Sequence, residues 1–536
     1  MLLLSIRGEG TMLSKVLVAI AAFSSIQASA EVSVCSSGFY YASFMKQKIE
    51  THKVDLDPAW VDSMIDREKS DQQHMINKSV QSVGKNYMNW SDHVLRDHNE
   101  YYSNEIPKRR PKDQCSSGRC WIFAGTNTLE GALKVRGHVP MDFQFSETYI
   151  YFFSMLERAN RYLEEQIQAA NRVQSGNGVR KILYKNLVSD GGFFSDFQFL
   201  VEKYGLVPKN AMPDTFNSRN SGPMIQEIND YLVSKSQEIW SVIDYLKKDN
   251  HHVDRFLADR FDMTLPDKDP QKIDQQNFEI LRKIKMQVMS GAFKILETHL
   301  GTPPKKFQFR HVDVIKDPET GKSKAQYGDV GEYTPREFSK LFVGFNQDSF
   351  VSIAALPTRK RDQSYIMDTP TTGLKQKRGF SFLNLSTERM VELIKKSIDS
   401  YVPVYFAADF SAPMDSWQSG VMHPDLKSTK GLYDFTEGEA PHDYDKVIRQ
   451  FHLQSYANHA VIIDAYDQPK DFDHPIKFRI ENSWGEFAGN NGHYHMYLEW
   501  LVEYGFFITI QKEFLSNEEL QMLENPESIK SSDWYL

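Results

Sequence analysis

Cysteine is scarce in this chain, which has three cysteines among 536 residues. Cys35, Cys115 and Cys120 can form at most one disulfide and leave one thiol over, which excludes a disulfide framework. The chain also has no CxxC pair and no HExxH spacing, so no metal site is expected. The unpaired thiol therefore needs a chemical explanation.

Long apolar runs and long runs of basic charge are missing as well. After the N-terminus no stretch is long and apolar enough to cross a bilayer, so no membrane span is expected. The formal net charge is -8, and the short basic cluster at 107–112 fits a solvated linker, so nucleic acid is not expected as a partner. Hydrophobic and charged fractions of 40% and 25% are ordinary for a globular protein.

The N-terminus carries a targeting pattern. Residues 12–30 contain Lys15, an apolar run over 16–23 and the small residues Ala28-Ser29-Ala30. A basic start, a short apolar core and an A-x-A site are typical of a secretory signal peptide. We therefore predict cleavage near Ala30 and export of the mature protein, to the periplasm or outside the cell. A buried N-terminal helix is the alternative.

The order of helical and strand-like patterns indicates an α+β fold. Apolar stripes predict helices over 120–137 and 145–173, and a third after a glycine turn at 189–192. Ser146 is the expected N-cap of the second helix. In the second half, short β-rich runs predict strands at 402–410, 459–467, 476–483, 492–498 and 504–511.

The length of 536 residues exceeds one ordinary core, so several domains or a large insertion are expected. The predicted segments are a signal peptide (1–30), an N-terminal extension (31–105), a helical lobe with the nucleophile (106–224), a mainly helical insertion (225–345), a β-rich lobe (346–512) and a C-terminal arm (513–536).

Cys120 lies where a helix is predicted to begin. Unpaired backbone N–H groups and the helix dipole stabilise an anion there, so we expect a lowered thiol pKa and a reactive thiolate. The side-chain amide of Gln114 can donate to a developing oxyanion together with the backbone N–H of Cys120. Gly118 permits a close approach of the chain. These features favour a nucleophile over a buried structural thiol.

A nucleophilic cysteine needs a base, and the base needs a group that orients it. His459 opens a predicted strand, and Asn482 ends another predicted strand nearby in the sequence. Two such strands bring an amide next to an imidazole at the edge of one sheet. Asn482 is then expected to hold the tautomer of His459 that serves as base, with Trp484 shielding the pair from water.

Three stretches carry a family resemblance: DQCSSGRCWIFAG (113–125), NHAVIIDAY (458–466) and IENSWGEFAGNNGHYHMY (480–497). They resemble the cysteine, histidine and asparagine blocks of papain-like cysteine peptidases, and SSGRCW resembles the bleomycin hydrolase and aminopeptidase C branch. The resemblance runs from about residue 85 to the C-terminus. The separation of Cys120 from His459 exceeds the ~130–150 residues usual in papains, and the surplus matches the helical insertion of this branch.

The resemblance implies a papain-like fold of two lobes, with a helical lobe carrying the cysteine and an antiparallel β lobe carrying histidine and asparagine. It implies peptide-bond hydrolysis through a thioester without metal or organic cofactor. The implied catalytic roles are nucleophile for Cys120, general base and acid for His459, orienter for Asn482 and oxyanion donor for Gln114. The implied substrate-binding residues are Asp190, Gly191, Gly192, Trp484 and Leu536.

In this branch the terminal carboxylate, here of Leu536, receives the α-amine of the peptide substrate and makes the enzyme an aminopeptidase. The arm of this chain ends at Trp534-Tyr535-Leu536 and is short, so an endopeptidase of the same fold is an alternative. A non-catalytic scaffold relative is another. The resemblance also implies a homohexamer. Cys115 departs from the usual lysine, and it is an incidental thiol, a partner of Cys35 or an oxidation partner of Cys120.

Overall fold

The computed structural model describes residues 56–84, 91–136, 139–140, 142–172, 187–248, 252–262, 273–316, 323–344, 346–367, 380–426 and 446–530. The predicted signal peptide, Cys35 and Leu536 lie outside these residues. The chain separates into two compact units, Met1–Asn77 and Lys78–Leu536. In the first unit, Asp57 caps α3 (Pro58–Ile65) by accepting the backbone N–H of Ala59 at 3.0 Å, and α4 (Asp71–Val83) begins there.

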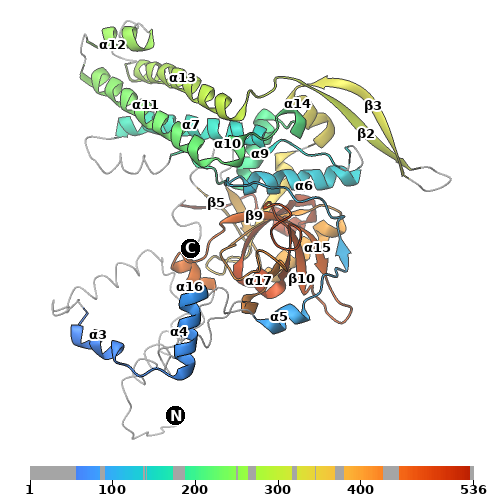
Figure 1. Ribbon diagram of the computed structural model, residues 1–536. Coiled ribbons are helices and arrows are strands. Elements are labelled where there is room, and N and C mark those ends of the chain that lie inside the picture. The colour runs from blue at the N-terminus through green and yellow to red at the C-terminus, as the bar shows by residue number, and fades with distance from the viewer. Residues whose placement is uncertain are drawn as a thin grey trace, which may run out of the picture. The chain divides into compact units, whose positions relative to one another are not determined.

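Helices dominate the first half of the second unit. Ser146 begins α7 by accepting the backbone N–H of Tyr149 at 3.1 Å, which confirms the expected N-cap. Three long helices, α7, α11 and α13, run side by side (Figure 1). The helices here are α5 (Asp92–Asp97), α6 (Cys120–Arg136), α7 (Glu147–Arg172), α9 (Phe194–Tyr204), α10 (Phe216–Arg219), α11 (Gly222–Lys248), α12 (His252–Phe261) and α13 (Ile273–Leu300).

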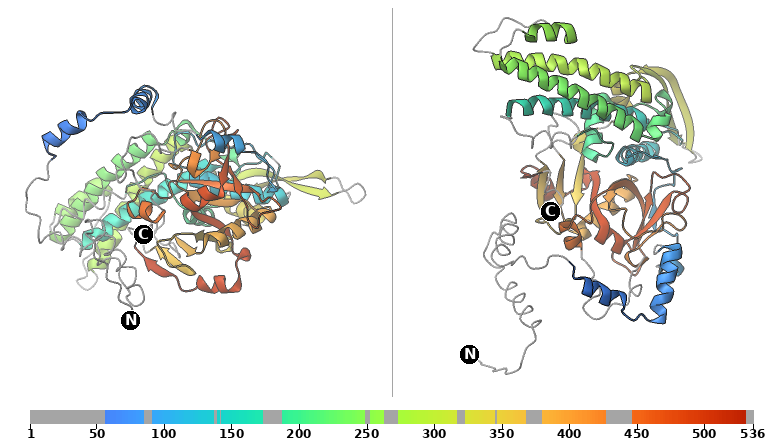
Figure 2. Two further views of the ribbon diagram at one scale, coloured as in Figure 1. Left: turned by 90° about the horizontal axis from the view of Figure 1, so that it is seen from below. Right: turned by 60° about the vertical axis from the view of Figure 1, so that its left-hand side comes forward.

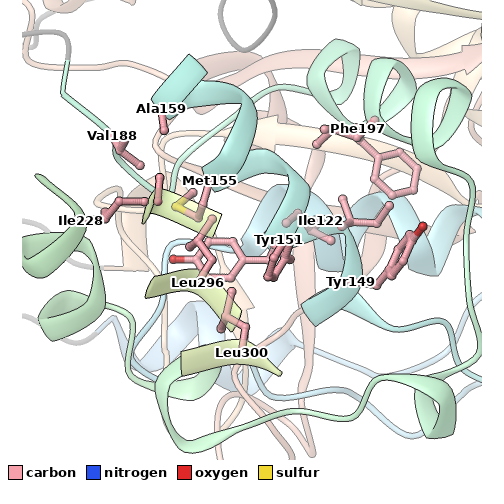
Figure 3. Packing of buried hydrophobic residues seen from close by; sticks show 14 of the residues in the cluster. Ile122, Tyr149, Tyr151, Met155, Ala159, Val188, Phe197, Ile228, Leu296 and Leu300 are labelled. Atoms are coloured by element: carbon pink, nitrogen blue, oxygen red, sulfur yellow. The ribbon is translucent and has the colours of Figure 1, made fainter. Parts of the chain in front are cut away.

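Apolar faces of these helices form one core. Figure 3 shows Ile122 of α6, Met155 of α7, Ile228 of α11 and Leu296 of α13 meeting in it, and each is buried. Burying a side chain of this size stabilises a fold by about 1.5–3 kcal/mol, so the cluster holds the start of α6 firmly against the other helices.

Strands dominate the second half. In the described part of the chain, an 11-stranded sheet has the order β13-β5-β6-β4-β12-β7-β9-β10-β11-β8, with β1 paired to β9. The pairs along β4-β12-β7-β9-β10-β11 are antiparallel. The strands are β1 (Asn104–Glu105), β4 (Phe350–Ala354), β5 (Gln363–Met367), β6 (Ser381–Asn384), β7 (Val404–Ala408), β8 (Val421–Met422), β9 (His459–Asp467), β10 (Lys477–Glu481), β11 (His493–Tyr497), β12 (Gly505–Gln511) and β13 (Glu527–Ile529).

The central strand β9 joins the helical core to the β core. Its side chains alternate, so that Ala460 and Ile462 pack into the helical core while Val461 and Ile463 pack into the core beneath α15 (Thr387–Asp399). Helix α6 lies against the first of these faces (Figure 1). The start of α6 and the start of β9 are therefore held at one junction.

The segment between α13 and the sheet contains a hairpin as well as helices. Strands β2 (Phe307–Lys316) and β3 (Ser323–Tyr333) pair with each other in a two-stranded sheet, and the left view of Figure 2 shows this hairpin projecting from the helices. Short helices follow at α14 (Pro335–Phe338), α16 (Lys446–Phe451), α17 (Leu498–Tyr504) and α18 (Asn517–Met522). Among the described residues, no helix combines the length and apolar character needed to cross a membrane.

Candidate active site

Cys120 is the first residue of α6, and the chain reaches it through a tight loop. The backbone N–H of Gly118 donates to Oδ2 of Asp190 at 2.6 Å, and a Cβ on Gly118 would lie 2.4 Å from Oδ1 of the same carboxylate. Only glycine fits at this approach. The Cys120 side chain is partly buried, and the helix begins as the sequence predicts.

His459 begins β9, and Asn482 directly follows β10. Nε2 of His459 lies 2.8 Å from Oδ1 of Asn482, which also accepts the backbone N–H of Ser483 at 2.7 Å. Because Oδ1 only accepts, Nε2 carries the proton and the other ring nitrogen, Nδ1, is left as the base. The structure thus brings together the imidazole and the amide that the sequence paired.

Aromatic rings cover the histidine. The Trp484 ring stacks on the His459 ring at 4.7 Å between centroids, and Phe410 meets it edge-on at 4.8 Å. His459 is 8% exposed and Asn482 is fully buried. Trp484, predicted both as a shield and as a substrate-binding residue, lies where it excludes water from the pair.

Gln114 lies where the helical and β parts meet. Its Nε2 donates to the carbonyl of Ser117 at 2.5 Å, and its Oε1 accepts the Ser483 hydroxyl at 2.6 Å. The backbone N–H of Gln114 donates to the carbonyl of Ser483 at 2.8 Å, and that of Gly485 donates to Lys112 at 3.0 Å. Segment 112–114 is therefore paired with segment 483–485, beside Asn482.

The Cys120 thiol lies against the residue that follows His459. The backbone N–H of Ala460 lies near enough to the sulfur to lower the pKa of the thiol. Among the described residues, no direct hydrogen bond joins Sγ of Cys120 to His459, and Nδ1 of His459 has no partner. Hydrogen bonds of this kind commonly tighten only when substrate binds.

Burial keeps both groups neutral in the free site. It raises the pKa of Cys120 to about 11, although backbone N–H groups of Ala460 and Trp121 lower it. It also lowers the pKa of His459 to about 4, opposed by the hydrogen bond to Asn482. This corrects the lowered thiol pKa that the helix start predicts, because desolvation outweighs the helix N–H groups. In the free site the thiol proton is therefore on sulfur, and Nδ1 of His459 carries none.

The turn predicted to line the substrate cleft packs against the start of α6. The carbonyl of Asp190 accepts the Trp121 indole N–H at 2.8 Å, and the carbonyl of Gly191 accepts Arg158 at 2.5 Å. A Cβ on Gly192 would lie 2.7 Å from the Trp121 ring. Gly191 is exposed, with nothing within 4 Å of an added Cβ.

A buried network of charges lies beneath the cysteine loop. Nζ of Lys112 is 2.6 Å from both Glu130 and Glu147. Burial raises the pKa of Glu147, whereas Lys112 lowers it, and the net result is a pKa of about 2. Arg119, which is fully buried, pairs with Asp214 at 3.1 Å. Lys112 and Ser483 had no distinctive local signal in the sequence, and their roles emerge only from the fold.

One cluster in the described part of the chain has the side chains of a metal site. Asp464, Glu481 and His493 are buried, and one donor atom from each lies within 4.8 Å of the others. Both carboxylates are already paired, Asp464 with Arg479 at 2.7 Å and Glu481 with Arg109 at 2.9 Å. These arginines supply the positive charge, so the cluster is a buried layer of ion pairs on strands β9, β10 and β11.

The Cys115 side chain lies near that of Arg219. Sγ of Cys115 accepts a hydrogen bond from Nε of Arg219 at 3.1 Å, and its backbone has a φ of 54°. Its suggested partner Cys35 lies outside the described residues, as does Leu536. The structure therefore leaves the disulfide and the carboxylate anchor as predictions.

Comparison with known proteins places this geometry in a family. The model of the Peptidase C1-like family matches residues 56–265 and 268–535. Aminopeptidase C from Streptococcus thermophilus is 28% identical over 428 residues, covering 79% of this chain and 85% of that protein. Aminopeptidase C from Lactobacillus delbrueckii subsp. lactis is 27% identical over 424 residues, covering 78% and 82%.

The fold has a counterpart among solved structures. The crystal structure of PepW from Lactobacillus rhamnosis superposes with a TM-score of 0.71 at 22% identity, covering 89% of this chain and 98% of that one. The mixed helical and β architecture is thus the papain-like fold that the resemblance implied.

Proposed function

Because the chain belongs to the Peptidase C1-like family and is a cysteine-type peptidase, we propose that it is an aminopeptidase with Cys120 as nucleophile. The observation that carries the proposal is the hydrogen bond between Nε2 of His459 and Oδ1 of Asn482, 2.8 Å long. This bond leaves Nδ1 of His459 as the base. The backbone N–H of the next residue, Ala460, lies near the Cys120 sulfur. The relatives named aminopeptidase C support the exopeptidase assignment.

The proposed reaction begins with proton transfer from Sγ of Cys120 to Nδ1 of His459. The thiolate attacks the carbonyl carbon of the substrate, and the backbone N–H of Cys120 and Nε2 of Gln114 donate to the oxyanion. One hydrogen of Nε2 is held by Ser117, which leaves the second for the oxyanion. The imidazolium of His459 then protonates the leaving amine, and a thioester remains on Cys120.

Hydrolysis of the thioester completes the proposed cycle. Nδ1 of His459 removes a proton from water, the hydroxide attacks the thioester, and the acid product leaves. The proton returns to the Cys120 sulfur. The imidazole of His459 carries the proton in each step, and the hydrogen bond to Asn482 keeps its Nδ1 as the atom that gains and loses it.

The substrate backbone is proposed to pair with the turn after Asp190. The carbonyls of Asp190 and Gly191 are already engaged, whereas Gly192 has no backbone hydrogen bond to another described residue. Gly192 therefore offers its N–H and C=O to a peptide in an extended conformation. Trp484, whose ring stacks on that of His459, is also proposed to contact the substrate.

The terminal carboxylate of Leu536 is proposed to receive the α-amine of the substrate. An endopeptidase of the same fold is the alternative. Free and N-acetylated peptides of one sequence distinguish the two, with Cys120→Ala as the blank. Cleavage of the free peptide alone supports the aminopeptidase, and equal cleavage of both rejects the carboxylate anchor. Hydrolysis by Cys120→Ala at the normal rate rejects the nucleophile, and binding without hydrolysis by the unchanged chain supports a scaffold.

Export and assembly form a separate part of the proposal. The basic, apolar and A-x-A elements of residues 12–30 support a signal peptide cleaved near Ala30. The resemblance to the bleomycin hydrolase and aminopeptidase C branch is the ground for proposing a homohexamer. N-terminal sequencing of the secreted chain tests the first point, and light scattering on the purified protein tests the second. A mature chain that starts at Met1, or a monomer, contradicts them.

A further inference from the structure

We propose that Asp190 is a positioning residue for the nucleophile, because its carboxylate holds the loop that carries Cys120 and its carbonyl holds the first turn of α6. This inference rests on the proposed role of Cys120. It gives the Asp190 side chain a task distinct from the substrate contact that the sequence predicted for the turn.

The contacts of Asp190 flank the cysteine on both sides. Oδ2 accepts the backbone N–H of Gly118 at 2.6 Å, two residues before Cys120. The backbone carbonyl accepts the indole N–H of Trp121 at 2.8 Å, one residue after it. Trp121 is fully buried, so its ring fixes the first turn of α6. A charge-assisted bond and a buried indole thus set the position of Sγ.

A third segment holds the carboxylate in place. The Ser221 hydroxyl donates to the same Oδ2 at 2.6 Å, and the backbone N–H of Ser221 donates to the carbonyl of Ser116 at 3.2 Å. Ser221 directly precedes α11, whose Ile225 N–H donates back to its carbonyl at 3.0 Å. The cysteine loop, the turn and α11 therefore meet at one carboxylate oxygen.

The atoms around these hydrogen bonds are closely packed. An added Cβ would come within 2.4 Å of Asp190 at Gly118 and within 2.7 Å of the Trp121 ring at Gly192. A side chain shorter than Asp190 leaves the Gly118 N–H without its acceptor and frees the loop to move. A displacement of about 1 Å at a reacting atom can cost about 100-fold in rate.

The charge of Asp190 has an effect that can be separated from its hydrogen bonds. After burial, which is the larger cause, the carboxylate raises the pKa of the Cys120 thiol. Asp190→Asn keeps an oxygen that can accept from Gly118 but removes the charge. Asp190→Ala removes both. Position and charge therefore give different results in the two variants.

The test compares Asp190→Ala and Asp190→Asn with Asp230→Asn, which removes the same charge from an exposed position on α11. For Asp190→Ala we expect kcat to fall by about 10- to 100-fold with KM little changed. For Asp190→Asn we expect most of kcat to remain, and the pH at which iodoacetamide alkylates Cys120 to move down. Asp230→Asn should match the wild type.

The alkylation readout does not depend on turnover, so it separates this proposal from the proposed function. If Cys120→Ala retains hydrolysis, the proposed function fails, whatever Asp190 does. If Asp190→Ala keeps its kcat, or if Asp190→Asn loses as much as Asp190→Ala with an unchanged alkylation profile, the positioning role is wrong. Should Asp190→Ala not fold, Ser221→Ala replaces it, with an expected loss of about 3-fold in kcat, and an unchanged kcat counts against the proposal.

Discussion

The Ser483 hydroxyl donates to Oε1 of Gln114 at 2.6 Å, across the junction between the helical part and the sheet. Ser483 follows Asn482, and Gln114 precedes the loop of Cys120. With Oε1 bound, the Gln114 amide has a fixed orientation and turns its NH₂ group toward the carbonyl of Ser117. The proposed oxyanion donor is thus oriented by the segment that also orients the proposed base.

Loss of this contact is expected to lower both catalysis and stability by a modest amount. Ser483→Ala leaves Oε1 of Gln114 without its donor, so the amide can rotate, and kcat should fall by about 3- to 10-fold at a cost near 1 kcal/mol of folding free energy. Gln114→Ala should lower kcat by about 100-fold or more. Kinetics of both single variants and of the double variant check this, since the two losses should not add. Additive losses would show that Ser483 acts independently of Gln114.

Removal of the Asn482 amide is expected to disorient the base. Asn482→Ala frees Nε2 of His459, so both tautomers become populated and kcat should fall by about 10- to 100-fold. The kcat of His459→Ala should fall further, by about 100- to 10,000-fold. Steady-state rates on an aminoacyl fluorogenic substrate measure both. Equal activity of Asn482→Ala and wild type would contradict the assigned tautomer.

The pH dependence should have an unusually wide plateau. Below about 4 His459 holds a second proton and cannot accept one from sulfur, and above about 11 the pair has lost the proton that the leaving amine needs. We therefore expect kcat/KM in the free enzyme to be flat between these limits. A basic limb near the ordinary cysteine pKa of about 8.5 would contradict a neutral Cys120 thiol in the free enzyme.

Acid should destabilise the fold through buried histidines. Burial lowers the pKa of His98 and His459 to about 4 and that of His495 to about 3, and also lowers that of His493. The unfolded chain binds more protons than the folded one below the ordinary value of about 6.5, so stability is lost as pH falls from there toward the folded pKa values. Urea unfolding at pH 7 and pH 5 measures the loss, and His495→Gln should reduce it. Equal free energies of unfolding at pH 7 and pH 5 would contradict burial of these rings.

Local patterns in the sequence predict the elements that carry the site, but not how they contact one another. The start of α6 at Cys120 and the whole of β9 follow from helical spacing and β-branched residues. The pairing of 112–114 with 483–485 joins segments far apart in the chain, and no local pattern encodes it. The sign of the Cys120 pKa shift depends on burial, which only the fold determines.

The buried network beneath the cysteine loop gives a prediction about stability. Lys112→Met leaves Glu130 and Glu147, which are 1% and 0% exposed, without the ammonium that lies 2.6 Å from each. Uncompensated buried charge costs about 3–5 kcal/mol, and Lys209 offsets part of it because it also pairs with Glu147 at 2.6 Å. Denaturant unfolding measures the loss, with the exposed Lys108→Met as control. Adding Glu130→Gln to Lys112→Met removes one stranded charge, so the double variant should be more stable than the single one. If it is less stable, the network does not hold the loop through charge pairing.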